Sequence, residues 1–242
     1  MTRFANKTAL VTGAASGIGE ATCLRLLSEG AVVIALDRVE EFPTGFEEYS
    51  NRVTLVQANL ALPLADDFLD RLGNVDVLVN AAGILHRSTT VDHSVEEWQR
   101  TLTVNVVAPY RLSSLFVRQR LRLDAPGAIV NVCSIESFTA AANHVAYTVS
   151  KSAVLMMTRA FALELAGKGV RVNGVAPGVT ATAMNQSLRA DPAAADALIG
   201  RIPAGRFGFA SEQASAIAFL ASDEASYITG AVLPVDGGWL TA

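Results

Sequence analysis

The sequence contains few charged residues and no excess of basic ones. Asp, Glu, Lys and Arg make up 17% of the 242 residues, and the formal net charge is −4. A nucleic-acid-binding protein would normally present a basic face, so this balance argues against such a partner. Long hydrophobic runs are also missing: the mean hydropathy is +0.34, but no apolar stretch approaches the roughly 18 residues of a spanning helix. We therefore expect a well-buried domain that does not insert into a membrane.

Cysteine and histidine are scarce as well. The two cysteines, Cys23 and Cys133, form neither a metal-ligand spacing nor a disulfide framework. Neither His86 nor His144 pairs with a Cys, Asp or Glu at a ligand spacing, and we expect no metal site. The first apolar run, Thr8–Val11, is too short for a secretion signal. These absences favour a cytoplasmic protein with reduced cysteines.

Short apolar runs rich in β-branched residues recur along the chain. Most are continuous rather than alternating, which is the pattern of strands buried on both faces of a sheet. These runs are Thr8–Val11, Val32–Leu36, Val53–Val56, Val75–Val79, Ile129–Val132, Val170–Val175 and Val232–Val235. Segments with helical spacing separate them, among them Ile18–Leu27, Trp98–Leu121 and Tyr147–Leu165. The alternation predicts an α/β fold, a doubly wound parallel sheet with helices on both faces.

No repeat, linker or low-complexity segment divides the chain, so we expect residues 1–242 to form a single domain. The Ala-rich piece Asp191–Leu198 is predicted to be a helix rather than a linker. The segment Arg38–Arg52 is too brief for a long crossover helix and contains Pro43 and Gly45. A loop or a short helix is expected there.

A glycine-rich turn follows the first predicted strand and opens the first helix. It reads Thr12-Gly13-Ala14-Ala15-Ser16-Gly17-Ile18-Gly19. Gly13 permits a tight turn, while Gly17 and Gly19 let the backbone approach a pyrophosphate at the positive end of the helix. The pattern predicts a dinucleotide site, although many α/β proteins also use glycine to turn a strand into a helix.

Asp37 ends the second predicted strand, eighteen residues after Gly19. A carboxylate there would accept hydrogen bonds from the adenosine ribose hydroxyls and repel a 2′-phosphate. Asp is also a common turn residue at strand ends. The glycine turn contains no Arg or Lys that could bind a 2′-phosphate, but Arg38 could partly host one. The sequence therefore favours NAD, with NADP still possible.

Tyr147 and Lys151 lie four residues apart, so their side chains share one face of a helix. Tyrosine has a reference pKa of about 10. A cation about 4 Å away would lower that pKa by about three units before desolvation is subtracted. The oxidised nicotinamide would add a second positive charge, and we expect the two charges together to bring the pKa of the Tyr147 phenol toward the operating pH, where proton transfer works best.

Ser134 lies at the C-terminal end of the predicted strand Ala128–Cys133, at the edge of a parallel sheet where ligands bind. Its hydroxyl could hold a substrate oxygen beside the Tyr147 phenol. A nucleophilic serine is the competing interpretation, but no serine lies in a G-x-S-x-G context. The pattern predicts hydride transfer between a nicotinamide cofactor and an alcohol or ketone, with Tyr147 as the proton donor or acceptor.

These motifs and their order resemble a classical short-chain dehydrogenase/reductase over essentially the full chain. Ser134, Tyr147 and Lys151 match the catalytic residues of that family, including the gap of thirteen residues from Ser to Tyr. The other matches are the glycine turn, Asn80-Ala81-Ala82-Gly83, Asn105, Arg171-Val172-Asn173, Pro177-Gly178, Thr180, Thr182 and the stretch from Phe219 to Gly238. The resemblance implies a Rossmann-type fold with a seven-stranded parallel sheet.

The resemblance also implies roles for individual residues. Tyr147 would be the acid/base, Ser134 would orient the substrate, and Lys151 would lower the tyrosine pKa and bind the nicotinamide ribose. Asn105 would support a proton relay through Lys151. The implied cofactor-binding residues are Gly13, Ser16, Gly17, Ile18, Gly19, Asp37, Arg38, Asn59, Leu60, Asn80, Ala81, Gly83, Tyr147, Lys151, Pro177, Gly178, Thr180 and Thr182. Asn59 departs from the usual Asp, but its oxygen could still accept a bond from the adenine amino group.

The substrate is less well determined by the sequence. His86, Glu136, His144 and Met184 are candidates for substrate contacts. A buried carboxylate at Glu136 would cost a few kcal/mol without a partner, which favours a hydroxylated or cyclic diol-like substrate. The alternatives are a 3-oxoacyl-[acyl-carrier-protein] reductase and a dihydrodiol dehydrogenase of the dihydroxybenzoate type.

Two further features concern surfaces. Arg118, Arg120 and Arg122 form a basic cluster, interpreted either as a solvated face or as a dock for an acidic carrier protein. The helix Tyr147–Leu165 is apolar nearly all round, which predicts burial on more than one side. In the resembling family this helix builds a dimer within a tetramer, so we expect a homotetramer.

Overall fold

The computed structural model describes residues 2–242 and contains one seven-stranded parallel sheet with the order β3-β2-β1-β4-β5-β6-β7. The strands are β1 Thr8–Thr12, β2 Val32–Asp37, β3 Val53–Gln57, β4 Val77–Asn80, β5 Gly127–Val132, β6 Val170–Pro177 and β7 Val232–Val235. Each of the seven predicted strands is present, with ends within two residues of the prediction. The strand order reverses beside β1, which creates the crevice where α/β proteins bind ligands.

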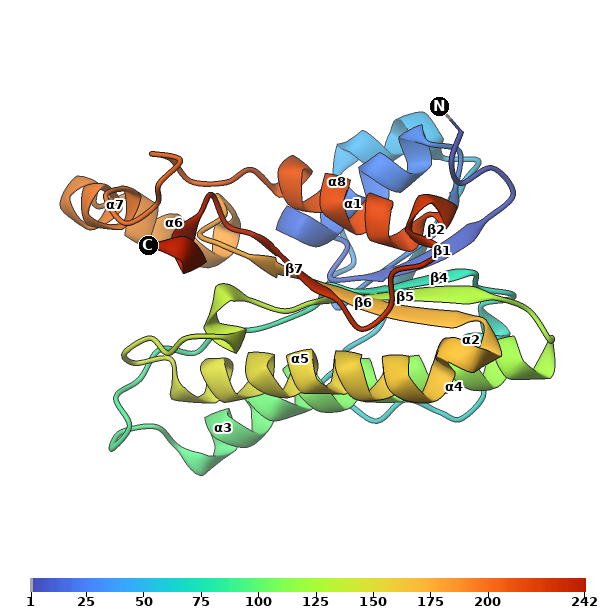
Figure 1. Ribbon diagram of the computed structural model, residues 1–242, viewed down its shortest axis with the longest axis horizontal. Helices are drawn as coiled ribbons and strands as arrows, with labels where there is room; N and C mark the ends of the chain where they lie inside the picture. The colour runs from blue at the N-terminus through green and yellow to red at the C-terminus, as the bar shows by residue number, and fades with distance from the viewer. Residues whose placement is uncertain (1) are drawn as a thin grey trace.

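Helices cover both faces of the sheet (Figure 1). Their bounds are α1 Gly17–Ser28, α2 Phe68–Arg71, α3 Val95–Leu102, α4 Ala108–Arg122, α5 Val145–Leu165, α6 Gln186–Arg189, α7 Pro192–Ile199 and α8 Ala210–Ala221. Helices α1 and α8 lie on one face, and α4 and α5 lie on the other. Helices α6 and α7 lie beyond the end of the sheet, as Figure 1 shows. The predicted doubly wound fold is confirmed.

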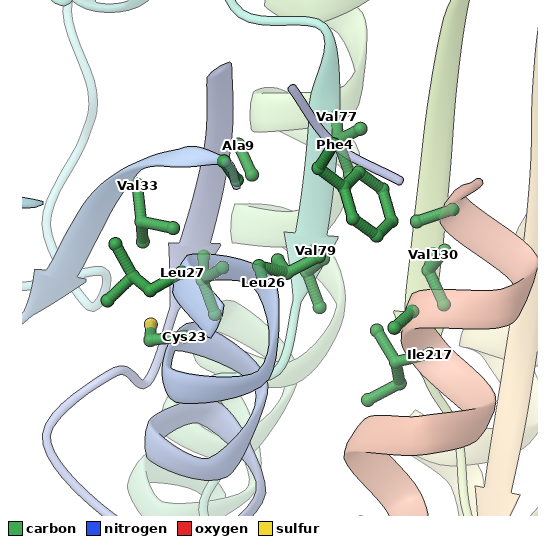
Figure 2. Packing of buried hydrophobic residues seen from close by; sticks show 14 of the residues in the cluster. Phe4, Ala9, Cys23, Leu26, Leu27, Val33, Val77, Val79, Val130 and Ile217 are labelled. Carbon is green, nitrogen blue, oxygen red and sulfur yellow. The ribbon is translucent and has the colours of Figure 1, made fainter. Parts of the chain in front are cut away.

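The alternation of side chains along each strand explains the continuous apolar runs. In β1, Ala9 and Val11 face the core beneath α1 and α8, whereas Leu10 between them faces the core beneath α4. Figure 2 shows the first of these cores, where Leu26 and Leu27 of α1 and Ile217 of α8 pack on the sheet. Because both faces of β1 are covered, successive residues of the strand are apolar rather than alternating with polar ones.

The predicted helix Trp98–Leu121 is interrupted by a π-helical turn, Thr103–Val107, between α3 and α4. Pro109 supplies a reason that can be read in the sequence. It lies four residues after Asn105 and has no N–H, so the carbonyl of Asn105 lacks its usual helical partner. Such turns recur at functional sites. The short connection between β2 and β3 contains a 3₁₀ helix, Thr44–Tyr49, which agrees with the loop or short helix expected for Arg38–Arg52.

The basic cluster on α4 is not a uniform solvated face. Arg120 is buried and forms an ion pair with Asp76 at 2.9 Å, and Arg122 pairs with Asp70 at 2.7 Å. Arg118 alone is exposed without an ion pair among the described residues. Two of the three charges are therefore neutralised within the chain, which removes the support for a docking surface for an acidic carrier. No helix of residues 2–242 is long and apolar enough to cross a membrane.

Candidate active site

A cavity of about 970 Å³ opens at the carboxyl ends of the strands. Its lining begins at the glycine turn and reaches Ser134, Tyr147 and Lys151. Among the residues proposed to contact the cofactor, all but Asn80 line it. The side chain of Asn80 points away into a buried network, donating to Asn131 Oδ1 at 2.8 Å and to Ser113 Oγ at 3.2 Å. Asn80 therefore joins the sheet to α4 rather than lining the cavity.

The glycines of the turn serve different purposes. A Cβ atom on Gly13 would lie 2.8 Å from the Cα of Ala82, and one on Gly19 would overlap the carbonyl oxygen of Gly13. These two glycines permit backbone-to-backbone packing. Gly17 has φ +58, and a Cβ atom on it would lie 3.2 Å from Cγ2 of Thr182. Ser16 caps α1 without a side-chain capping bond, so its hydroxyl and the N–H groups of the helix are available to a phosphate.

Asp37 is held at the end of β2 by two backbone N–H groups. Its Oδ2 accepts from Ala15 at 3.1 Å, and its Oδ1 accepts from Arg38 at 2.7 Å. The first bond fixes the carboxylate against the glycine turn, at the position where a ribose would lie. Asn59 Oδ1 accepts from the backbone N–H of Ala61 at 3.0 Å. The oxygen proposed to bind adenine therefore already has one partner, and only its second lone pair is open.

Ser134 is oriented by the turn that follows β5, the 3₁₀ helix Ile135–Ser137. The N–H of Glu136 donates to Ser134 Oγ at 3.1 Å. Since that bond uses a lone pair, the hydroxyl proton of Ser134 remains free to point into the cavity. Ser137 Oγ accepts from the N–H of Ser134 at 3.2 Å and donates to the carbonyl of Lys151 at 2.7 Å. Ser137 thus ties the turn carrying Ser134 to the helix carrying Tyr147.

Lys151 lies next to Tyr147, and burial shifts the pKa of both side chains. The ammonium of Lys151 lies 5.7 Å from the centroid of the Tyr147 ring and donates to the carbonyl of Val132 at 2.7 Å. Desolvation raises the pKa of Tyr147 to about 12, with the hydrogen bond to Ser134 acting in the opposite direction. Burial lowers the pKa of Lys151 to about 8. In the cofactor-free chain, desolvation therefore outweighs any effect of the lysine on the phenol.

Asn105 lies in the π-helical turn behind the cavity wall. Its Oδ1 accepts from the N–H of Ile84, and its Nδ2 donates to the carbonyl of Ile84, both at 2.9 Å. These bonds fix the loop after β4. A Cβ atom on Gly83 would lie 3.4 Å from Lys151 Nζ and 3.5 Å from Asn105 Oδ1, so glycine leaves the lysine its place. Asn105 positions this wall and does not itself line the cavity.

The far wall of the cavity follows β6. Pro177, Gly178, Thr180 and Thr182 all line it. Thr180 Oγ1 donates to the carbonyl of Gly178 at 3.1 Å and accepts from Gln213 of α8 at 3.3 Å. Thr180 also bridges to Gly208, which closes the base of the segment that carries α6 and α7. This wall is therefore anchored to α8 at its base.

The candidate substrate residues divide into two groups. Glu136, His144 and Met184 line the cavity, but His86 does not. His86 Nδ1 instead lies 3.8 Å from Glu97 Oε2, so the expectation of a substrate contact there is corrected. Glu136 accepts from Thr148 Oγ1 at 2.8 Å and lies 2.9 Å from His144 Nδ1. Its carboxylate has protein partners, contrary to the argument that it needs substrate hydroxyls.

Arg87 lies at the site although the sequence analysis does not propose it as a functional residue. It lines the cavity and donates through Nε to His144 Nε2 at 3.2 Å. The contact joins residues 57 positions apart. Only its position after the Asn80–Gly83 motif could have indicated it. The cavity wall also contains Arg201, stacked on Trp239 at 4.2 Å from the ring centroid.

A nicotinamide dinucleotide fits the residues of this cavity. A glycine cradle, an uncommitted Ser16 hydroxyl and a fixed carboxylate at Asp37 form one end, and an acid/base tyrosine beside a serine hydroxyl forms the other. No group of three or more metal-binding side chains occurs in the part of the chain that the structure describes. Fold and site together define a nicotinamide-dependent oxidoreductase of the dinucleotide-binding α/β class.

Comparisons with known proteins agree with this class. A family model described as "Enoyl-(Acyl carrier protein) reductase" matches residues 13–240. The 3-oxoacyl-[acyl-carrier-protein] reductase of Thermotoga maritima is 38% identical over 98% of both chains. L-xylulose reductase of Mesocricetus auratus is likewise 38% identical over 98% of both chains. A solved structure from Beutenbergia cavernae, assigned as an NAD(P)-dependent gluconate 5-dehydrogenase with bound NADP, is 40% identical over the whole of both chains, with a TM-score of 0.95.

The chain belongs to the short-chain dehydrogenase/reductase family. It is an oxidoreductase that acts on hydroxyl groups with NAD(P). The relatives act on an acyl carrier thioester, a sugar and a sugar acid according to their names, so family membership leaves the substrate open.

Proposed function

We propose that this protein interconverts an alcohol and a ketone on a small to medium polyhydroxylated substrate, with Tyr147 as the acid/base. The observation that carries the proposal is one continuous cavity, which joins the glycine turn to Ser134 and Tyr147. Ser134 donates to the substrate oxygen, and Tyr147 exchanges the proton with it. Lys151 holds its charge close to both. A bound nicotinamide supplies the acceptor or donor of the hydride.

The polarity of the cavity near Tyr147 supports a hydroxylated substrate. Arg87, His144, Glu136 and Thr148 follow one another in a chain of hydrogen bonds along this wall. A long acyl chain against this wall would displace water from the terminal nitrogens of Arg87 and offer no acceptor in its place. A polyol can hydrogen-bond to the same surface. The neutralised arginines of α4 also remove an argument for an acyl carrier protein as partner.

The substrate class can be tested by following cofactor fluorescence with four groups of compounds. These are polyols, sugar acids, a cyclic dihydrodiol and a 3-oxoacyl thioester. We expect kcat/KM to be highest for a polyol or a sugar acid, because both can bond to the polar wall. A higher kcat/KM for the thioester or the dihydrodiol would contradict the proposal and favour the corresponding alternative.

We expect NAD to be preferred over NADP. The Asp37 carboxylate is fixed against the glycine turn, where it would repel a 2′-phosphate. The measurement is the ratio of kcat/KM with the two cofactors. A preference of tenfold or more for NADP would show that Arg38 outweighs Asp37. In that case Arg38→Gln should lower kcat/KM for NADP and leave that for NAD unchanged.

We also propose that the protein is a cytoplasmic homotetramer. Helix α5 packs on the sheet and nevertheless exposes Val149, Met156 and Leu163, the last of them 86% exposed. An exposed apolar surface on a helix that already packs against a sheet is typical of a subunit interface. Light scattering at micromolar concentration should report a tetramer, or at least a dimer. Leu163→Glu should lower the mass, and a stable wild-type monomer would contradict the proposal.

A further inference from the structure

Four polar side chains form a chain of contacts, and three of them, Arg87, His144 and Glu136, line the cavity. Arg87 Nε donates to His144 Nε2 at 3.2 Å, and His144 Nδ1 lies 2.9 Å from Glu136 Oε1. The second oxygen of Glu136 accepts from Thr148 Oγ1 at 2.8 Å. These residues come from the loop after β4, the turn after β5 and the start of α5. Three separate parts of the fold therefore meet at this contact.

The direction of each hydrogen bond is determined by chemistry. A guanidinium can only donate, so His144 Nε2 must accept from Arg87 and carries no proton. The ring proton lies on Nδ1, which donates to the Glu136 carboxylate. Glu136 thereby selects the neutral tautomer of His144 that can hold Arg87.

This arrangement leaves the charge of Arg87 without an opposite charge. Four arginines line the cavity: Arg38, Arg87, Arg100 and Arg201. Of these, only Arg100 has a carboxylate partner within 4.0 Å among residues 2–242, namely Glu97 at 3.4 Å. The Glu136 carboxylate is used by His144 and Thr148. The two terminal nitrogens of Arg87 have no hydrogen-bond partner in the described part of the chain.

Arg87 also lies close to the reacting group. The rings of His144 and Tyr147 meet edge to face, with centroids 6.3 Å apart. The guanidinium is therefore one imidazole ring away from the phenol. The charge of Arg87 lowers the pKa of Tyr147, and that of Glu136 raises it, as expected for groups at this range. A substrate whose carbinol lies between Ser134 and Tyr147 can extend to the open side of Arg87.

We propose that Arg87 binds a carboxylate of the substrate, so that the enzyme selects polyhydroxylated acids over uncharged polyols. This inference rests on the proposed function, because it takes the reacting carbinol to lie at Tyr147. The planar guanidinium offers two parallel donors, the geometry that matches a carboxylate. Glu136 and His144 are positioning residues: Glu136 orients His144, His144 holds Nε of Arg87, and the terminal nitrogens remain without a protein partner among residues 2–242.

The test compares pairs of molecules in which a carboxylate replaces a hydroxymethyl group on the same polyol chain. D-Gluconate is paired with D-sorbitol and L-tartrate with L-threitol, and each is added to the NAD-saturated protein. Binding is measured by the rise in melting temperature, and turnover by cofactor fluorescence. For the wild type we expect a rise with the acids at concentrations where the neutral polyols give none. Arg87→Gln should abolish the rise with the acids and increase KM for any acid that reacts at least tenfold, with kcat changed less than threefold.

Two further variants test the specific geometry. Arg100→Gln is the matched control, because Arg100 lines the same cavity but is paired with Glu97; it should change KM for the acids less than twofold. His144→Phe removes the acceptor for Arg87 and should raise KM for the acids. His144→Gln restores an acceptor beside a donor and should recover most of that loss. A merely structural role for His144 predicts no such recovery.

The outcomes separate this inference from the proposed function. If the acids raise the melting temperature through Arg87 but no polyol or sugar acid is turned over, the carboxylate site stands and the proposed reaction fails. If neutral polyols react as well as the acids and Arg87→Gln affects both equally, the reaction stands and the inference is overturned. An absent melting response of the wild type to both acids overturns it too, as does an equal loss in Arg100→Gln.

Discussion

Replacing Tyr147 by Phe should lower kcat by at least about a hundredfold, the low end of what a positioned acid or base contributes to a rate. The substitution removes only the hydroxyl of a side chain that lines the cavity together with Ser134. The dissociation constant of the cofactor should change little. Lys151→Ala should reduce both turnover and cofactor affinity, since the lysine is proposed to bind the ribose as well. Stopped-flow turnover and a cofactor fluorescence titration measure the two effects separately.

A matched control is available in Tyr227→Phe, because Tyr227 is fully exposed and does not line the cavity. Its kcat should stay within twofold of the wild type. If the Tyr147→Phe variant keeps more than about a tenth of the rate, a barrier change under ~1.4 kcal/mol, Tyr147 is not the proton donor.

The pH profile of the wild type provides a second measure of the same role. Because desolvation raises the pKa of Tyr147 to about 12, the phenol is protonated at neutral pH. Alcohol oxidation needs the phenolate as a base, so its kcat/KM should rise with pH between 6 and 8. Ketone reduction uses the protonated phenol and should not rise. An oxidation rate that is flat over this range would assign the base to another group.

Gly19→Ala should destabilise the fold and abolish cofactor binding. The new Cβ atom would lie 2.6 Å from the carbonyl carbon of Gly13 and overlap its oxygen, and neither atom belongs to a side chain that can rotate away. Overpacking of this kind costs about 3 kcal/mol or more when the backbone must shift. In a chain of this length, that lowers Tm by roughly 6–12 °C. Thermal denaturation and a cofactor titration provide the measurements.

Gly167→Ala is the control for this substitution. Nothing lies within 4 Å of a Cβ atom at Gly167, and its φ is not positive. The added methyl group should leave Tm unchanged or raise it slightly, because it restricts the unfolded chain. If Gly19→Ala melts within about 2 °C of the wild type, a shift worth under roughly 1 kcal/mol, and still binds the cofactor, the close backbone contact is not required.

The sequence by itself determined the layout of the fold. Strands buried on both faces carry nearly continuous apolar runs, so Val32–Leu36 and Ile129–Val132, the latter with Asn131 as its one polar residue, could be recognised without any partner. The glycine turn and the Tyr147–Lys151 pair each lie within one short segment. The relative positions of their residues follow from the geometry of a turn or a helix, so the sequence is enough to predict them. The π-helical turn Thr103–Val107 is not predicted from the sequence, because the hydrophobic spacing around it is helical throughout and Pro109 interrupts only the hydrogen bonding.

Only the tertiary structure decided how charges are paired and how strongly water is excluded. Arg120 forms an ion pair with Asp76, and Glu136 contacts His144 and Thr148. These partners come from different segments of the chain, and no local sequence pattern predicts that they are in contact. The pKa of Tyr147 could not be read from the nearby Lys151, because desolvation depends on everything packed around the phenol. Arg87 acquired its place at the cavity in the same way, since its partner His144 lies on a different loop. The spacing of residues in the sequence identifies candidate functional groups, whereas tertiary packing determines which of these groups remain unpaired and able to bind a substrate.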